Sequence, residues 1–494
     1  MLNILLVHPE YPVTYWSYKH ALKFISKKAT NPPLGLLTVA SLLPPGWNTR
    51  LVDLNVTNLR DKDILWADYI FISAMSVQMH SVKDTICRCK SLNKKIVAGG
   101  PLFTAEFDSF QDVDHLILNE AEITLPLFLK DLQAGNAKRL YQTTEHADIT
   151  RSPVPDFSLI DVSKYAMLNL QYSRGCPFNC EFCDITALLG HKVRLKTTAQ
   201  ILDELDSIKK IGWKGPVFFV DDNFIGNKSI LKKELLPAII NWMRKNNNPF
   251  IFTTEASINL ADDPALMHLM VKAGFAKVFI GIETPEEASL AECNKFQNNN
   301  RDLVQSVKTI QSVGMEVMAG FIVGFDNDTP SIFQRQIDFI QKSGIISAMV
   351  GLLNAPKKTQ LYKRLMHEGR ITNDWSGDNT NYSLNFIPVM NKQELLNGYQ
   401  KILHGIYSSK AYYKRISIFF KNFNPPVHLK KKLTFVDIIA LFKSMIIIGI
   451  FTKSRWYYWE LFFWCVFRKP ELFPLAITYS IYGYHYRKVF KGIR

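Results

Sequence analysis

The sequence alternates twice between short apolar segments and helical patterns, and this alternation narrows the possible folds more than any other feature. In the first stretch, candidate helices such as 33–43 and 81–92 lie between apolar segments at 3–7, 49–54, 69–74, 95–100 and 115–119. Strands that alternate with helices form parallel sheets with helices on both faces. Residues 1–150 are therefore predicted to form a doubly wound, Rossmann-like α/β domain, whose ligands bind at the carboxyl edge of the sheet.

The second alternation predicts a barrel. Its six apolar segments lie at 168–173, 216–222, 250–256, 276–283, 316–325 and 348–353. Six strand–helix units make a partial (β/α)6 barrel, and barrel active sites lie at the carboxyl ends of the strands. The Pro-rich segment "RSPVPDF" (151–157) marks the boundary before it, so we expect the barrel to occupy residues 151–371.

Residues 372–494 are predicted to form a helical extension of different character. From residue 401 onward there are 17 Lys and Arg against three acids, which leaves the first 400 residues near neutral within the total of +15. Three aromatic-rich apolar runs (438–451, 456–467 and 472–486) are interrupted by Lys443, Glu460 or Pro474. Each is too short for the ~20 apolar residues of a spanning helix.

Two interpretations of these runs stay open. Aromatic residues flanked by Lys and Arg are typical of segments that lie in the membrane interface, and this is the favoured one. The alternative is that the helices only pack on the barrel. Nucleic acid is not an expected partner, because its basic contacts would form a polar stripe instead of bordering apolar runs.

Cysteine use and the amino terminus indicate the compartment. Seven cysteines, unevenly spread, do not suggest a disulfide framework. The first residues, "MLNILLVHPEYP", are typical of a buried strand and lack the pattern of a signal peptide. We expect a cytoplasmic protein on the inner face of the cytoplasmic membrane.

Three cysteines, Cys176, Cys180 and Cys183, lie within eight residues just after the first barrel strand. Structural zinc sites use four ligands, and no fourth Cys or His is close in the sequence. Three thiolates on one loop can hold three corners of a [4Fe–4S] cube. The fourth iron is then open to a substrate, although a zinc site or a purely structural cube remains an alternative.

This stretch, "SRGCPFNCEFCDI", resembles the radical S-adenosylmethionine (SAM) superfamily, including the aromatic Phe182 before the last cysteine. The resemblance implies that SAM chelates the open iron and is cleaved to a 5'-deoxyadenosyl radical. It further implies that barrel strand ends contact SAM, through Glu255, Gly281, Glu283 and Gly320, with Gly324 nearby. No catalytic residue is assigned. Asp221, Asp222 and Asn223 face either the cofactor or substrate, or cap the following helices.

The amino-terminal domain carries "PPLGLLTVASLLP" (32–44), "GGP" (99–101) and "EAE" (120–122). With the barrel motifs, these resemble the cobalamin-dependent (class B) radical SAM family, nearest to hopanoid C-2 methylase-like proteins. The resemblance implies cobalamin in a pocket near Ser73, Gly99 and Gly100. His8 lacks the Asp and Gly that accompany a cobalt-ligating His in many such domains, so we expect cobalt to bind without a protein His.

These features predict a radical SAM methyltransferase that acts on an unactivated carbon of an apolar small molecule or lipid, with a hopanoid-like lipid favoured. An external low-potential reductant would be a partner. The alternatives are a cobalamin-dependent cyclase, another tetrapyrrole- or isoprenoid-modifying enzyme, or a non-enzymatic iron–sulfur electron carrier. The remaining cysteines, Cys87, Cys89, Cys293 and Cys465, are expected to be structural.

Overall fold

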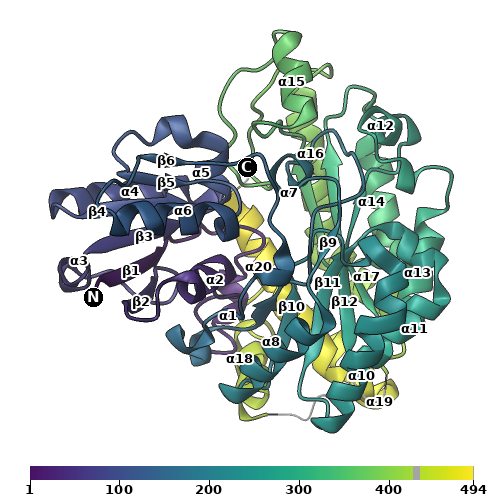
Figure 1. Ribbon diagram of the computed structural model, residues 1–494. Helices are drawn as coiled ribbons and strands as arrows, with labels where there is room; N and C mark the ends of the chain where they lie inside the picture. The colour runs from purple at the N-terminus through teal and green to yellow at the C-terminus, as the bar shows by residue number, and fades with distance from the viewer. Residues whose placement is uncertain (427–433, 493–494) are drawn as a thin grey trace.

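The computed structural model describes residues 1–426 and 434–492. Two parallel sheets stand side by side, and a set of carboxyl-terminal helices packs against the second (Figure 1). In Figure 1 the amino-terminal sheet lies on the left and the barrel on the right, while the long helix α20 (Phe473–Val489) passes between and behind them. Part of the predicted extension, residues 427–433 and 493–494, lies outside the described residues.

The first sheet has six strands in the order β2-β1-β3-β4-β5-β6, and every neighbouring pair is parallel. Five of the strands match the predicted segments. The sixth, β6, has two residues, too few to leave an alternating pattern in the sequence. The strands are β1 (Asn3–His8), β2 (Asn48–Asp53), β3 (Tyr69–Ser73), β4 (Lys95–Gly99), β5 (His115–Ile117) and β6 (Leu140–Tyr141).

Helices cover both faces of this sheet, as predicted for a doubly wound domain. One core joins the sheet to α2 and α6, through Leu36 and Phe128, and the other joins it to α3, α4 and α5, through Val82 and Phe103. The helices are α1 (Lys19–Leu22), α2 (Leu34–Leu42), α3 (Asp61–Trp66), α4 (Met79–Ser91), α5 (Pro101–Glu106) and α6 (Ala121–Gln133).

The second sheet also has six parallel strands, in the order β14-β13-β12-β11-β10-β7. These are the six predicted strands in chain order, so the partial barrel is confirmed. They are β7 (Leu168–Leu170), β10 (Pro216–Phe219), β11 (Ile251–Ala256), β12 (Phe275–Glu283), β13 (Glu316–Val323) and β14 (Ala348–Leu352). The longer helices between and after them are α8 (Thr198–Lys210), α10 (Leu236–Lys245), α11 (Pro264–Ala273), α13 (Leu303–Ser312) and α14 (Ile332–Ser343).

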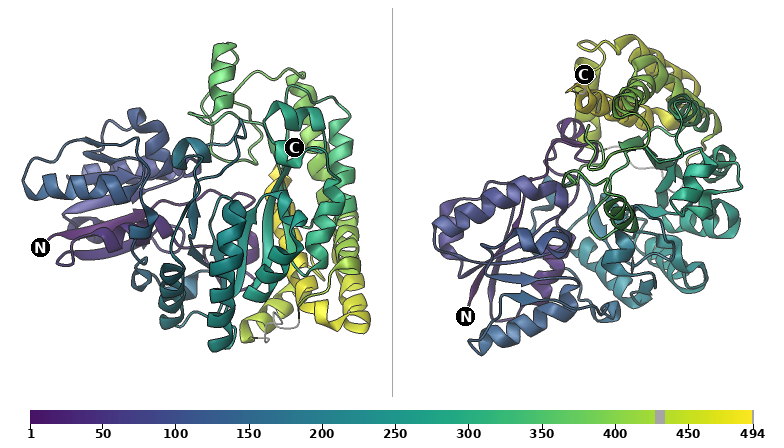
Figure 2. Two further views of the ribbon diagram at one scale, coloured as in Figure 1. Left: turned by 45° about the vertical axis from the view of Figure 1, so that its right-hand side comes forward. Right: turned by 90° about the horizontal axis from the view of Figure 1, so that it is seen from above.

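The carboxyl-terminal helices pack mainly on the barrel. α16 and α17 lie against α14, and their buried residues, such as Tyr399 and Phe420, belong to the same apolar core as the barrel. Among the described helices, none combines the length and the apolarity that crossing a bilayer requires. The helices are α16 (Lys392–Tyr407), α17 (Ser409–Asn422), α18 (Phe435–Ile447), α19 (Arg455–Arg468) and α20, and Figure 2 shows them stacked along one side of the barrel.

Candidate functional site

A cavity of about 780 Å³ lies between the carboxyl edges of the two sheets. The first sheet contributes its strand ends, including Ser73 and Gly99, and the barrel contributes Asn169, Arg174 and Asp222. Its volume falls within the ~300–1,000 Å³ of small-molecule sites. Both edges are the ones where parallel sheets bind ligands, so the fold places two binding edges around one space.

Close packing explains the small residues at the edge of the first sheet. Gly100 has φ +91°, and a Cβ there would lie 2.5 Å from Ser73 Oγ. A Cβ on Gly99 would lie 2.6 Å from the carbonyl oxygen of Ile117. Any side chain at these positions would push β3, β4 and β5 apart. All three predicted residues, Ser73, Gly99 and Gly100, line the cavity.

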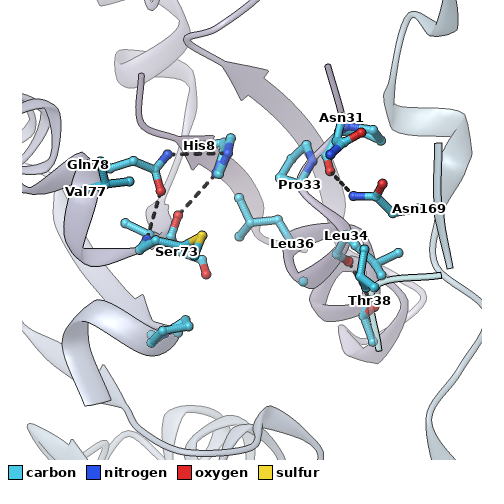
Figure 3. Close-up of a pocket in the computed structure, with 18 of the residues that line it drawn as sticks. His8, Asn31, Pro33, Leu34, Leu36, Thr38, Ser73, Val77, Gln78 and Asn169 are labelled. Carbon is cyan, nitrogen blue, oxygen red and sulfur yellow. Dashed lines mark hydrogen bonds between the residues drawn. The ribbon is translucent and has the colours of Figure 1, made fainter. Parts of the chain in front are cut away.

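His8 ends β1 and lines the same cavity, but both of its ring nitrogens have protein partners. Nδ1 lies 3.4 Å from the carbonyl oxygen of Ser73, and Nε2 lies 3.4 Å from Gln78 Nε2, as Figure 3 shows. Burial lowers the pKa of His8, so the neutral ring donates through Nδ1 to Ser73 and accepts from Gln78. His8 therefore supports β3 and is not presented as a free ligand.

The cysteine loop connects the two short strands of an antiparallel hairpin, which was not predicted from the sequence. Its strands are β8 (Ser173–Arg174) and β9 (Arg194–Leu195), and α7 (Ile185–Leu189) follows the last cysteine. Gly175, with φ +91°, has no room for a Cβ, which would lie 2.7 Å from the carbonyl oxygen of Lys192. The Cys176 amide donates to Gly190 O at 3.2 Å. The chain is thus forced into a tight turn directly before Cys176.

Glu181, inside the loop, anchors it to α15 (Gln360–His367). Arg364 donates from Nε and Nη2 to the two carboxylate oxygens of Glu181, at 2.6 and 3.1 Å. The Glu181 amide also donates to the carbonyl of Cys293 at 3.0 Å. A bidentate pair of this kind fixes direction as well as distance, so the loop is held from the side of the barrel.

Arg174 anchors the other end of the loop to the amino-terminal domain. It donates to Glu120 at 2.7 Å and to Glu122 at 2.7 Å, and Arg194 donates to Glu120 at 2.8 Å. Arg174 and its neighbours hold the pKa of Glu122 down, to about 2, despite burial. The "EAE" motif at 120–122 therefore connects the domain to the cysteine hairpin.

A second cluster gathers beside the cysteines at the end of β12. Lys295 Nζ lies 2.7 Å from Glu283 Oε1 and 6.0 Å from the centre of the Phe182 ring. A Cβ on Gly281 would lie 2.7 Å from that ammonium nitrogen. Gly281 pairs in register with Gly320 on β13. Phe182, Gly281, Glu283 and Gly320 are therefore neighbours, and Lys295 is a cation that the sequence analysis missed.

Three carboxyl groups form a third cluster, at the ends of β10 and β11. Burial raises the pKa of Asp221 to about 6, of Asp222 to about 7 and of Glu255 to about 8, and the nearby carboxylates add to the effect for the last two. Asp221 accepts from the backbone amides of Tyr172 and Ser173. Asn223 accepts from the Ser257 amide at 3.2 Å.

Among the three consecutive residues 221–223, Asp222 is the one that faces a ligand space. Its Oδ2 is buried, has no hydrogen-bond partner among the described residues, and belongs to a residue that lines the cavity. Asp221 and Asn223 stabilise the backbone of adjoining loops instead of capping the following helices. The ligand-facing interpretation therefore fits Asp222, and the capping interpretation fits neither Asp221 nor Asn223.

The donor set at the loop fits an iron–sulfur cube. Cys176, Cys180 and Cys183 are partly exposed and unpaired by disulfides, and the Lys295 ammonium acts on Cys180 and Cys183 as a positive charge. Within the described chain, no group of three or more His, Cys, Asp or Glu side chains converges on a single ion. In a [4Fe–4S] cube each thiolate binds a different iron, so the three cysteines need not converge on a single ion. The loop lies at the border of the cavity, because Arg174 and Ile185, on either side of it, line that space.

The sequence matches the radical SAM superfamily over residues 170–340 and a domain of unknown function over residues 359–494. It is 39% identical over 490 residues to an uncharacterised methyltransferase of Synechocystis sp., covering 98% of this chain and 91% of that protein. It is 36% identical to the hopanoid C-2 methylase of Rhodopseudomonas palustris, covering 78% of this chain and 73% of that protein. The chain belongs to the radical SAM methyltransferase family.

The fold of this methyltransferase is that of the cobalamin-dependent radical SAM enzymes. The solved structure of OxsB with aqua-cobalamin and SAM bound superposes with a TM-score of 0.63 at 16% identity, over 100% of this chain and 80% of that one. The predictions of family, fold class and enzymatic activity are confirmed. The predicted cofactors agree with the radical SAM match and with this fold.

Proposed function

We propose that this methyltransferase transfers a methyl group to an unactivated carbon of an apolar, lipid-like substrate, with a hopanoid-like lipid as the first choice. The observation that carries the proposal is the cavity shared by the two sheet edges, with the cysteine loop at its border. That arrangement puts one space within reach of both the barrel edge and the first-sheet edge. The external source of electrons is a low-potential reductant.

On the barrel side, we propose that Cys176, Cys180 and Cys183 hold the [4Fe–4S] cluster. Phe182, Glu255, Gly281, Glu283 and Gly320 border the adjoining SAM site. When bound there, the cluster and SAM would supply a carbon-centred radical able to remove a hydrogen atom from the substrate. Lys295 offsets the negative charge that three thiolates bring into a half-buried loop. The Glu181–Arg364 pair keeps the loop aligned with the strand ends.

On the other side, we propose that the edge at Ser73, Gly99 and Gly100 holds cobalamin, which supplies the methyl group. The edge fits this role because its wall is backbone and small side chains, into which no Cβ at Gly100 could be added. The engagement of His8 with Ser73 and Gln78 supports cobalamin binding without a protein His as ligand to cobalt. Arg174 ties this edge to the cysteine hairpin through Glu120 and Glu122.

The substrate class is supported by the lining of the cavity and by the relatives. Apolar side chains from α2, α6 and α7 face the space, among them Leu36, Val39, Leu125, Ile185 and Leu188. Such walls exclude water from a radical reaction and bind a hydrocarbon without needing polar partners. The relative that is 36% identical is named for a hopanoid, which makes a polycyclic lipid the first substrate to test.

We further propose a division of labour along the chain. Residues 1–150 form the cobalamin-binding domain, residues 151–371 form the radical SAM barrel, and residues 372–494 form an extension that contacts the membrane. The enzyme would then work as a peripheral protein on the inner face of the cytoplasmic membrane, where an apolar substrate dissolves.

The test uses purified protein reconstituted anaerobically with iron, sulfide and cobalamin, then given SAM with a deuterated methyl group, a strong reductant and a hopanoid in detergent. The expected products are 5'-deoxyadenosine and a hopanoid that carries the deuterated methyl group, both detected by mass spectrometry. Cys183→Ala should give neither. Deoxyadenosine with a cyclised, unlabelled product would favour the cyclase alternative, and absence of deoxyadenosine from the wild type would refute radical chemistry.

A further inference from the structure

Exposed apolar side chains are concentrated on two of the carboxyl-terminal helices. In the described part of the chain, 20 large apolar side chains are classed as exposed, and 11 of them lie between residues 435 and 467, with exposed fractions from 40% to 80%. Single exposed apolar residues are ordinary on a protein surface, whereas a contiguous group indicates a contact site. We call this group the apolar face: Phe435, Val436, Ile438, Phe442, Ile446, Ile450, Phe451, Trp456, Phe463, Val466 and Phe467.

On α18 and α19, helical spacing gathers most of these residues on one side of each helix, and Ile450 and Phe451 lie in the segment between the two helices. On α18, Phe435, Ile438, Phe442 and Ile446 follow one another at three or four residues, which places them along a single stripe. The opposite side carries Ala440 and Ser444, which are buried. The helix therefore has one packed side and one bare apolar side.

α19 has the same division. Trp456, Phe463 and Phe467 point outward, and Tyr458 and Cys465 are buried. The hydroxyl groups of Ser444 and Tyr458 are hydrogen-bonded at 2.8 Å, which joins the packed sides of the two helices. Both helices also pack on α20, and they lie at the same end of the molecule in two views (Figures 1 and 2).

Cations border the apolar face. Lys453 and Arg455 stand exposed at the beginning of α19, and Arg468 stands exposed at its end. The Arg455 guanidinium lies 5.8 Å from the centre of the Trp456 ring. Apolar and aromatic side chains with a border of Lys and Arg are the pattern of helices that lie in the plane of an anionic membrane surface.

We propose that the apolar face inserts into the interface of an anionic phospholipid bilayer, with α18 and α19 lying in the membrane plane. A second copy of the chain is the competing occupant. The bilayer is favoured because the bordering cations complement anionic headgroups.

The attachment point is connected to the cavity through residues 14–30. Lys443, on α18, donates to the Lys23 carbonyl at 2.9 Å and to Ser26 Oγ at 3.1 Å. On α20, His485 Nε2 bonds the Tyr15 carbonyl at 2.9 Å. The same segment lines the cavity through Trp16 and Thr30, among others. A lipid that leaves the bilayer would therefore meet this segment first, an expectation that rests on the proposed lipid substrate.

The test is co-sedimentation of the full-length protein with vesicles of phosphatidylglycerol and phosphatidylethanolamine, and with vesicles of phosphatidylcholine alone. The triple variant F451S/W456S/F467S removes three of the most exposed side chains of the apolar face. We expect binding to anionic vesicles to weaken about tenfold or more. The matched control, L65S/L127S/V389S, changes three exposed apolar residues elsewhere and should bind like the wild type.

Two results would overturn the proposal. One is vesicle binding by the triple variant equal to that of the wild type. The other is a concentration-dependent dimer of the wild type, seen by light scattering after size exclusion, that the triple variant abolishes. Methylation of a detergent-solubilised substrate is measured in parallel. If the variant methylates normally while vesicle binding does not change, the docking proposal fails and the proposed function stands.

Discussion

The two six-stranded sheets border one cavity, and their edges present different kinds of side chain to it. At the ends of β3 and β4 the first sheet presents small, neutral groups, and the glycines there are dictated by the close approach of β3, β4 and β5. The edge of the barrel carries the ionisable groups Asp222, Glu255, Glu283 and Lys295, together with the cysteine loop. The first edge offers shape, and the second offers ionisable groups and metal ligands.

Under the proposed function, this difference matches what the two cofactors need from the sheet edges that bind them. A large ring system needs backbone that can approach closely, which glycine allows. A cluster with a charged amino-acid ligand needs fixed countercharges in a partly dry site, where they act strongly. If each sheet edge binds its own cofactor independently, a substitution at one edge should leave cofactor binding at the other edge unchanged.

The largest effect is expected from Cys183→Ala. Losing one thiolate of three should remove the cluster, so iron content and deoxyadenosine formation fall to background, while cobalamin binding is retained because the first edge is untouched. Iron analysis, electron paramagnetic resonance and cobalamin absorbance measure these outcomes. Cys87→Ser, at an exposed cysteine of α4, is the control. A Cys183→Ala protein with normal cluster content would break the assignment.

Arg174→Met should produce the next largest effect, because it removes the larger part of the link between the two edges and leaves only the Arg194–Glu120 pair. Glu120 and Glu122 would be left buried with less compensation, which costs about 3–5 kcal/mol of unfolding free energy. Urea unfolding near neutral pH measures it. Arg151→Met, at a side chain that is 85% exposed, should change stability little.

The pH dependence of stability gives a second test of the Arg174→Met prediction. In the wild type the pKa of Glu122 is lowered from 4.5 to about 2. Its stabilising contribution is therefore present above pH 4.5 and is lost as the pH falls toward 2. Arg174→Met should remove that acid-side loss. An unchanged acid profile would show that Arg174 does not hold Glu122 in solution.

The sequence was sufficient for the parts of the molecule that repeat. Apolar strands in a parallel sheet leave continuous apolar runs in the sequence, and the 11 strands of three or more residues in the two sheets were all predicted from such runs. The cysteine motif was equally visible, because its spacing is local. Two-residue elements such as β6, β8 and β9 leave no period to detect.

Long-range pairing was out of reach for a different reason. Glu181 and Arg364 are 183 residues apart, and Arg174 and Glu122 are 52 apart. Each looks like an ordinary surface charge until the fold brings its partner near. Lys295 was missed in the same way, because it stands in a polar stretch, "NKFQNNN". The carboxyl-terminal runs left two interpretations open, and the structure shows that α18 and α19 each have a packed side as well as a bare one.

A smaller effect is expected at the neutral edge from Gly100→Ala. The Cβ would meet Ser73 Oγ at 2.5 Å in a backbone conformation of φ +91°, which costs about 1–3 kcal/mol. We expect cobalamin affinity to fall about tenfold, with cluster content unchanged. Adding Ser73→Ala should recover part of the loss. Gly46→Ala, where a Cβ meets nothing within 4 Å, is the control, and equal affinity in both variants would contradict the close-packing account.

The smallest effect is expected at the barrel edge, as a change in how steeply stability varies with pH. The pKa of Glu255 is raised from 4.5 to about 8, chiefly by burial. Between these values the folded protein keeps a proton that the unfolded chain releases, so stability falls as the pH rises, by up to about 1.4 kcal/mol per pH unit. Glu255→Gln should flatten the decline of melting temperature between pH 5.5 and 7.5, leaving the part due to Asp221 and Asp222. Glu145→Gln, at an exposed glutamate, should keep the wild-type slope. If the melting temperatures of Glu255→Gln and the wild type fall equally with pH, Glu255 is already ionised in this range. The barrel edge would then carry more negative charge than the raised pKa values indicate, and the difference in charge between the two edges would be greater.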